Sequence, residues 1–190
     1  MLTLMKNEHL IEYEQASDEV REIYDDIMQV MCMLWVLNWF KRQALTPQLL
    51  KGNWQKIKST LFEGDIPLLL KQLILFKVSY ERGCKYCTFV HKKATESLAE
   101  NSDTIECGVT DDIYQAQLPR AYRTAMDVVS RCALEPFSTS EKDFEALIQV
   151  GFSEAEITEL FAQADLVNML NTFADIQRIE IDDEFFTLHE

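Results

Sequence analysis

Apolar residues recur at helical spacing along most of this 190-residue chain. In residues 68–82 (LLLKQLILFKVSYER) the apolar positions form a stripe broad enough to be largely buried. Residues 47–62 and 156–180 show the same spacing of three and four. No run of alternating apolar and polar residues lies between turn signals, as it would in a half-buried strand. The pattern therefore predicts an all-α fold.

Residues that cap helices mark the boundaries between these segments. Hydroxyl side chains followed by an acidic residue or a proline, which favour helix starts, occur at Ser17, Thr46, Thr110, Ser140 and Ser153. The first of them predicts a helix that runs towards the late twenties. Gly83 directly follows residues 68–82 and predicts the end of that helix, because glycine readily adopts the left-handed conformation found there.

The most apolar run is residues 27–40 (IMQVMCMLWVLNWF), which include Gln29 and Asn38. A helix that spans a bilayer needs ~20 apolar residues, so this shorter run predicts a buried helix. The first residues, MLTLMKNEHLIEYEQ, reach charged side chains too early for a secretory signal. We therefore expect a cytoplasmic protein with no membrane partner.

The overall charge points away from polyanionic partners. The chain has 18 basic and 32 acidic residues, a formal net charge of −14. A surface this negative repels phosphate backbones and anionic lipid headgroups, so we expect no nucleic-acid partner. No segment rich in Gly, Ser or Pro separates two halves, and residues 1–190 are expected to form one domain.

Candidate chemistry is concentrated in residues 80–91 (YERGCKYCTFVH). If the segment after Gly83 is a helix, Cys84, Cys87 and His91 stand at positions i, i+3 and i+7, on one face. A helix N-terminus stabilises a thiolate, so the sequence predicts a lowered pKa for a cysteine in this first turn. His91 is one turn beyond Cys87 and can act as its base.

This order predicts separate roles for the two sulfurs. Cys87, partnered by His91, is the candidate nucleophile towards an electrophile such as a peroxide. Its sulfenic acid would condense with Cys84 as the resolving thiol. Cys84, at the mouth of the helix, would also be the sulfur that an outside reductant meets first.

Two other interpretations of the motif remain open. A zinc-binding structural or interaction protein needs four ligands at a structural site, or three and a water at a catalytic one. Only three ligands are close in sequence, and a fourth would have to come from Cys32, Cys107 or Cys132 through folding. The three side chains can also simply fill a core. The pattern favours redox chemistry over both, since a close CxxC pair in a reducing compartment is typically redox-active or metal-binding.

The motif and its surroundings resemble the alkylhydroperoxidase D-like branch of the carboxymuconolactone decarboxylase superfamily. The resemblance rests on the apolar helix before GCKYC, on the histidine after it, and on the segments 47–67 and 151–180; it covers roughly residues 30–180. It implies an all-α fold with the CxxC at the N-terminus of a central helix, assembled as trimers or hexamers. It also implies a thiol-dependent peroxidase or disulfide oxidoreductase, with a hydroperoxide substrate and an external dithiol protein as reductant.

The resemblance assigns roles to individual residues. The second cysteine of the motif, Cys87, reacts with peroxide, Cys84 resolves it, and His91 relays protons. No cofactor and no metal ion are implied. The superfamily also includes decarboxylase-like lyases that act on small lactone acids without depending on the CxxC.

One position departs from the family pattern. Twelve residues before the first cysteine, where the family commonly has a glutamate, this chain has Gln72. Glutamine can accept a hydrogen bond from the imidazole, but it cannot take a proton. Because acid–base assistance is worth ~10²–10⁴-fold, we expect a weakened peroxidase. Glu81 is a candidate substitute, although a solvated carboxylate at a helix end is the simpler interpretation. Asn168 and Asn171, one turn apart on an otherwise apolar helix, are expected to hydrogen-bond near the redox site or across a subunit contact, or else to backbone groups in the core.

Overall fold

The computed structural model describes residues 10–98 and 118–187, and within these ranges it contains helices and no strand. The α-helices are α1 (Asp18–Met31), α2 (Asn38–Lys41), α3 (Pro47–Ile57), α4 (Leu68–Arg82), α5 (Lys85–Leu98), α8 (Arg120–Leu134), α9 (Glu141–Gln149), α10 (Glu154–Gln177) and α11 (Glu184–Thr187). The predicted all-α fold is therefore confirmed. The start signal at Thr110 lies outside the described residues.

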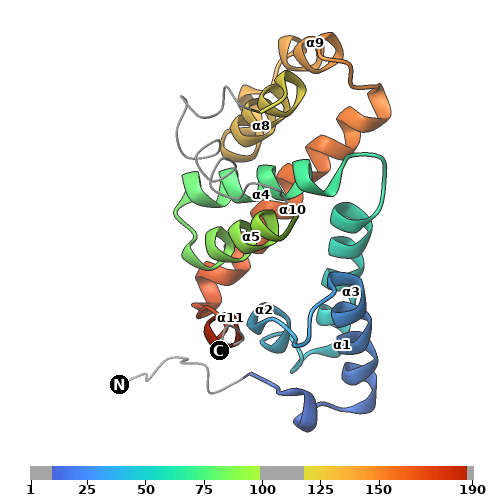
Figure 1. The fold of residues 1–190 in the computed structure, drawn as a ribbon, viewed down its shortest axis with the longest axis vertical. Helices are drawn as coiled ribbons and strands as arrows, with labels where there is room; N and C mark the ends of the chain where they lie inside the picture. Colours follow the sequence, from blue (N-terminus) through green and yellow to red (C-terminus); the bar gives the residue numbers. More distant parts are fainter. Residues whose placement is uncertain (1–9, 99–117, 188–190) are drawn as a thin grey trace.

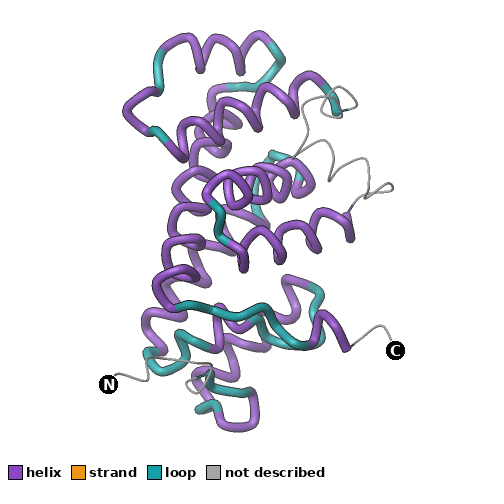
Figure 2. The backbone as a smooth tube through the Cα atoms, turned by 90° about the vertical axis from the view of Figure 1, so that its left-hand side faces the viewer, coloured by secondary structure: helices purple, strands orange, loops and turns teal. Residues whose placement is uncertain are grey.

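The helices α4, α5 and α10 form the centre of the structure (Figure 1). α4 and α5 form a hairpin, and the long helix α10 packs against both and against α8. α8 and α9 cover one end, whereas α1, α2 and α3 lie towards the other, where the C-terminal helix α11 also lies (Figures 1 and 2). Among the described helices, none is both long and apolar enough to cross a membrane.

A left-handed turn at Gly83 joins α4 to α5. Gly83 has φ +74°, and its N–H donates to the Tyr80 carbonyl at 3.1 Å. The next N–H, that of Cys84, donates to the Ser79 carbonyl at 3.1 Å. A side chain at this φ is strained, so glycine suits the position. The turn lets α5 return along α4. It also ends α4 at Arg82, which confirms the helix end that the sequence predicted at Gly83.

The prediction of one buried helix over residues 27–40 is wrong. α1 ends at Met31 because Cys32 adopts the left-handed conformation (φ 52°, ψ 42°), a position where glycine is the usual residue. The N–H groups of Cys32 and Met33 donate back to Gln29 and Met28 and satisfy the last carbonyls of the helix. The chain then runs through residues 33–37 without helix and resumes as the short helix α2.

The segment predicted as one helix over residues 47–62 is α3 followed by a π-helical turn, η3 (Lys58–Phe62). Lys71 of α4 is fully buried against this turn. Its ammonium donates to the Thr60 carbonyl at 3.1 Å and to the Glu63 carbonyl, and it pairs with Glu159 of α10. A buried ammonium is costly unless it is paired, so these contacts fix α4 against η3 and α10. They hold the next residue of α4, Gln72, in place.

Candidate active site

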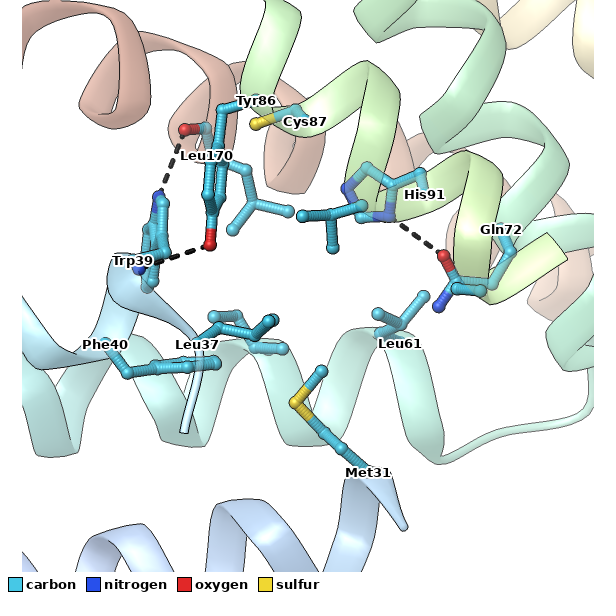
Figure 3. Close-up of a pocket in the computed structure, with 13 residues that line it drawn as sticks. Met31, Leu37, Trp39, Phe40, Leu61, Gln72, Tyr86, Cys87, His91 and Leu170 are labelled. Carbon is cyan, nitrogen blue, oxygen red and sulfur yellow. Dashed lines mark hydrogen bonds between the residues drawn. The ribbon is translucent and has the colours of Figure 1, made fainter. Parts of the chain in front are cut away.

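A cavity of about 60 Å³ lies between the first turns of α5, the N-terminal half of α4, the junction of α3 and η3, and the segment that contains α2 (Figure 3). Cys87, His91 and Gln72 all line it. The rest of its wall is mainly apolar and includes Met31, Leu37, Phe40, Leu61, Val90 and Leu170. One water needs ~10–15 Å³ of such space, so a small molecule fits beside the cysteine and the histidine.

His91 is held by Gln72 as a neutral base. The Nδ1–H of His91 donates to the Gln72 Oε1 at 2.9 Å, and both side chains are buried (Figure 3). An amide oxygen only accepts, so the proton is on Nδ1 and the lone pair on Nε2. Burial lowers the pKa of His91 from 6.5 to about 4, because the charged imidazolium loses its hydration. At neutral pH, His91 is therefore unprotonated at Nε2, and burial makes protonation there less favourable than for a solvated histidine.

The two cysteines differ in their access to the cavity. Cys87 lines it, whereas Cys84 lies behind it and has no exposed surface. The expectation that Cys84 is the first sulfur met from outside is therefore wrong for this conformation. Both thiols are free. Because Cys84 carries its side chain inward from the Gly83 turn, Cys87 is the one of the two cysteines that presents its thiol to a molecule in the cavity.

The expected lowering of the thiol pKa is also wrong. The hydrogen bond with Cys84 and then burial raise the pKa of Cys87 well above its ordinary value. Two adjacent buried thiols resist carrying charge, so the pKa of Cys87 is raised although the residue lies in the first turn of α5. Cys87 therefore needs a base to remove its proton, and His91 lines the same cavity one helical turn away.

Glu81 is not part of this site. Its carboxylate pairs with Lys77 at 2.9 Å and accepts a hydrogen bond from Ser130 of α8. It points to the side of α4 that faces α8 and does not line the cavity. Glu81 therefore stabilises the contact between two helices and does not substitute for Gln72.

The two asparagines of α10 have different surroundings. Asn171 lies next to Cys84: its backbone carbonyl is 4.0 Å from the Cys84 sulfur, and its Oδ1 accepts from Ser79 at 2.9 Å. Asn168 instead donates to the Ala133 carbonyl at 2.9 Å and accepts from Arg82. Asn171 therefore supports the inner cysteine, and Asn168 connects α10 with α8.

Sequence reasoning missed the role of Asp182. Its carboxylate is fully buried and accepts from the Asn38 backbone N–H at 2.6 Å and from the Tyr86 hydroxyl at 3.0 Å. The Tyr86 oxygen in turn accepts a hydrogen bond from the backbone N–H of Trp39 at 3.3 Å (Figure 3). The C-terminal segment thus holds both the start of α2 and Tyr86, one of the two residues between the cysteines. In the sequence, Asp182 is one acidic residue of three in a row, and no signal distinguishes it.

No group of three or more His, Cys, Asp or Glu side chains within residues 10–98 and 118–187 could hold a metal ion. Of the cysteines considered as further ligands, Cys32 is exposed at the end of α1. Cys132 is buried in α8, where its sulfur accepts from Thr139 at 3.2 Å. Cys107 lies outside the described residues.

Comparison with known proteins shows likeness in fold. No family model and no curated protein matches the chain. Among solved structures, a peroxidase-related protein from Silicibacter sp. TM1040 superposes with a TM-score of 0.83 at 20% identity, over 100% of both chains. A second peroxidase-related protein, described as an alkylhydroperoxidase AhpD core and from Ralstonia eutropha JMP134, gives 0.81 at 19% identity, over 92% of this chain and 91% of that chain.

A third structure belongs to a named enzyme. It is the debrominase Bmp8 with a cysteine replaced by alanine, in complex with 2,3,4-tribromopyrrole. It superposes with a TM-score of 0.77 at 18% identity, over 96% of this chain and 93% of that chain. The chain thus has the all-α fold of the alkylhydroperoxidase D-like proteins, as the resemblance in sequence implied.

Asp182 and His91 give opposite pH dependences of stability. Burial raises the pKa of Asp182 from 3.8 to about 6, so the folded state binds its proton more tightly than the unfolded chain does. Its contribution to stability is present below pH 4 and is lost as the pH rises through 6. Burial lowers the pKa of His91 to about 4, so its contribution is present above pH 6.5 and is lost as the pH falls through 4.

Asp182→Asn removes the first contribution and leaves the second. We expect the unfolding free energy of the wild type, relative to the variant, to fall by about 2 kcal/mol between pH 4 and pH 7. Urea unfolding followed by circular dichroism at several pH values measures this difference. Parallel pH profiles for the two proteins would contradict a titrating, buried Asp182.

Proposed function

We propose that this protein is a thiol-dependent peroxidase or disulfide oxidoreductase that reduces hydroperoxides through Cys84 and Cys87. The observation that carries the proposal is the arrangement at the cavity. Cys87 and a neutral His91 line it together, and a second thiol lies directly behind Cys87. The fold shared with the peroxidase-related proteins supports it, as does the CxxC followed by a histidine.

The proposed reaction proceeds in three steps. Nε2 of His91 takes the proton of Cys87, and the thiolate attacks the outer oxygen of the hydroperoxide. An S–O bond forms, the O–O bond breaks, and the leaving alkoxide takes the proton back to give an alcohol. The Cys84 thiol then attacks the sulfenic acid of Cys87, so a disulfide forms and water leaves. An external dithiol reduces the disulfide by exchange.

Burial of Cys84 has a consequence for the last step. Thiol–disulfide exchange requires that a thiolate reach one of the two sulfurs. In the reduced conformation only Cys87 faces the cavity, and Cys84 has no exposed surface. In this proposal the reductant therefore attacks Cys87, or the first turn of α5 opens when the disulfide forms. The reductant is a protein or small molecule with two thiols.

Cysteine variants test the proposal. Cys87→Ser should abolish hydroperoxide consumption with a dithiol reductant, because it removes the sulfur that lines the cavity. Cys84→Ser should still react once, and mass spectrometry after one equivalent of peroxide should show one added oxygen on Cys87. The wild type treated in the same way should lose two hydrogens through an intramolecular disulfide. Full turnover by Cys87→Ser, or thiols unchanged by peroxide in the wild type, would refute the proposal.

The amide at position 72 should limit the rate. Gln72→Glu places a carboxylate where the amide oxygen now accepts from His91, and a carboxylate stabilises the imidazolium. We expect the pKa of His91 to rise from about 4. We also expect the rate constant for peroxide at pH 7 to rise about 10-fold or more, within the range of acid–base assistance.

An NMR titration of His91 and stopped-flow kinetics measure the two effects. Gln72→Met, which keeps the length of the side chain but has no oxygen, serves as the control and should be slower than the wild type. A raised His91 pKa without faster peroxide reduction would mean that His91 does not act as the base.

The same pair of thiols can also serve a second reaction. The apolar cavity beside Cys87, together with the debrominase of the same fold solved with 2,3,4-tribromopyrrole, favours reductive removal of bromide from an aromatic ring. Two thiols supply the two electrons: the carbon–bromine bond breaks, a carbon–hydrogen bond forms, bromide and one proton leave, and Cys84 and Cys87 are left joined as a disulfide. Bromide release from 2,3,4-tribromopyrrole, compared between the wild type and Cys87→Ser, tests this candidate. If the wild type releases bromide no faster than Cys87→Ser does, this second reaction is eliminated.

A further inference from the structure

Asn171 of α10 carries a buried hydrogen-bond donor that has no partner. The residue has no exposed surface, and its Oδ1 accepts from the Ser79 hydroxyl at 2.9 Å. Its Nδ2 group makes no hydrogen bond within the part of the chain that the structure describes. Buried donors of this kind are rare, because each has given up its hydrogen bonds to water. Such a donor is available to a charge that arises only during a reaction.

The place of this donor in the fold distinguishes it from the others. Among the described residues, the remaining buried side-chain atoms without a partner are Trp35 Nε1 and Gln163 Oε1. Trp35 lies in the segment between α1 and α2, and Gln163 lies about two turns earlier on α10. Of these three described residues, Asn171 is the one that a cysteine of the CxxC motif contacts. The Cys84 thiol donates to the Asn171 backbone carbonyl at 4.0 Å.

Ser79 fixes the position of Asn171 relative to Cys84. The Ser79 hydroxyl holds Oδ1 of Asn171, and the Ser79 backbone carbonyl accepts from the Cys84 N–H at 3.1 Å. All three residues are fully buried. Because Oδ1 is occupied by the hydroxyl, the NH₂ group is the part of the Asn171 side chain that remains for another partner.

The proposed reaction requires negative charge on the sulfur of Cys84 at two points. Cys84 loses its proton as it attacks the sulfenic acid of Cys87, and it leaves as a thiolate when a reductant attacks Cys87. Cys84 has no exposed surface, so water does not solvate this charge. The Asn171 carbonyl that accepts from its S–H stabilises the neutral thiol and not the thiolate. A buried charge is costly without a partner, so the thiolate needs a donor from the protein.

We propose that the Nδ2–H of Asn171 donates to the sulfur of Cys84 when that sulfur is a thiolate. This inference rests on the proposed function. In disulfide reduction, a thiolate of the external dithiol attacks Cys87, the bond between Cys84 and Cys87 breaks, and its electron pair stays on Cys84, where the Nδ2–H stabilises it. The second thiol of the reductant then attacks the reductant sulfur that is bound to Cys87. The reductant ends as a disulfide, and its two protons end on Cys84 and Cys87.

The same hydrogen bond assists the formation of the disulfide. As Cys84 attacks the sulfenic acid of Cys87, the sulfur–oxygen bond breaks, and the oxygen leaves as water with the proton of the Cys84 thiol. Oxidation of Cys87 by the peroxide comes before this step and needs no charge on Cys84. The cycle therefore contains two steps that depend on Asn171 and one that does not.

The test removes the amide without leaving a new unpaired group. The double variant Ser79→Ala/Asn171→Leu removes both partners of one hydrogen bond, and apolar side chains suit this buried position. Ser79→Ala is its reference, because it keeps the Asn171 amide. Asn168→Leu is the matched control: it makes the same substitution one turn earlier, where the partners are Arg82 and the Ala133 carbonyl. Circular dichroism checks folding, and Asn171→Met, which is unbranched and adapts to the site, replaces Asn171→Leu if leucine prevents it.

Disulfide reduction tests the inference without any peroxide. Each protein is oxidised with diamide and then reduced with dithiothreitol, and mass spectrometry after timed alkylation follows the release of the Cys84 and Cys87 thiols. A hydrogen bond to a charged group changes an equilibrium by about 10- to 100-fold, and about half of this effect on a logarithmic scale appears in the exchange rate. We therefore expect the double variant to be reduced about 3- to 10-fold more slowly than Ser79→Ala, and Asn168→Leu to stay within about twofold of the wild type. Equal rates for the double variant and Ser79→Ala would overturn the inference.

A single turnover with peroxide separates a role in the reaction from a general loss of structure. The rate constant for oxidation of Cys87 in the double variant should stay within about twofold of that in Ser79→Ala, whereas the sulfenic acid should persist about 3- to 10-fold longer. Equal slowing of oxidation and of disulfide formation would indicate a structural defect and overturn the inference. If none of the proteins consumes peroxide, the proposed function fails, and the reduction experiment still decides whether Asn171 stabilises the Cys84 thiolate.

Discussion

The left-handed turn at Gly83 is the constraint on which the candidate site depends. It reverses the chain between α4 and α5, so that Gln72 and His91, nineteen positions apart, meet at 2.9 Å. It also directs Cys84 inward to Asn171 of α10 and leaves Cys87 facing the cavity. The hydrogen bonds of the turn use backbone groups, so the side chains of the hairpin remain free for packing and for chemistry. Moving this turn by one residue would change the face that each site residue occupies.

Burial determines the chemical character of the site. His91 stays neutral because its environment cannot solvate an imidazolium, and its partner is an amide that offers no compensating charge. The pKa of Cys87 is raised by its neighbouring thiol and by burial, so its thiolate forms only when the proton is removed by a base. A neutral histidine offers the free lone pair for that task, and the lowered pKa of His91 makes the transfer cost free energy. The cavity therefore combines a protonated nucleophile with an unprotonated base, and the reaction starts with a proton transfer between them.

The C-terminal segment joins the site to its surroundings. Asp182 holds the Asn38 N–H and the Tyr86 hydroxyl in one buried network, and Phe185, three residues later, packs against Trp35 and Phe89. The two hydrogen bonds that this carboxylate accepts offset only part of the cost of its burial, so its pKa stays raised. One anchor thus orients the first turn of α5 and the aromatic contacts of α11.

The sequence by itself determined the helices with strong local signals, because periodic apolar stripes and caps act within a few residues of each other. The helix of residues 68–82, its end at Gly83 and the shared face of Cys87 and His91 needed no tertiary information. The resemblance placed Gln72 where a partner of His91 is expected, and the structure shows the hydrogen bond between them. Tertiary structure decided the rest. Residues 27–40 are similarly apolar before and after the break at Cys32, and the part that follows the break is held to the C-terminal segment by the hydrogen bond from Asn38 to Asp182. Whether a thiol or a carboxylate is buried is likewise a property of its neighbours in space. That is why the raised pKa of Cys87, the position of Glu81 and the anchor at Asp182 became visible only in the folded chain.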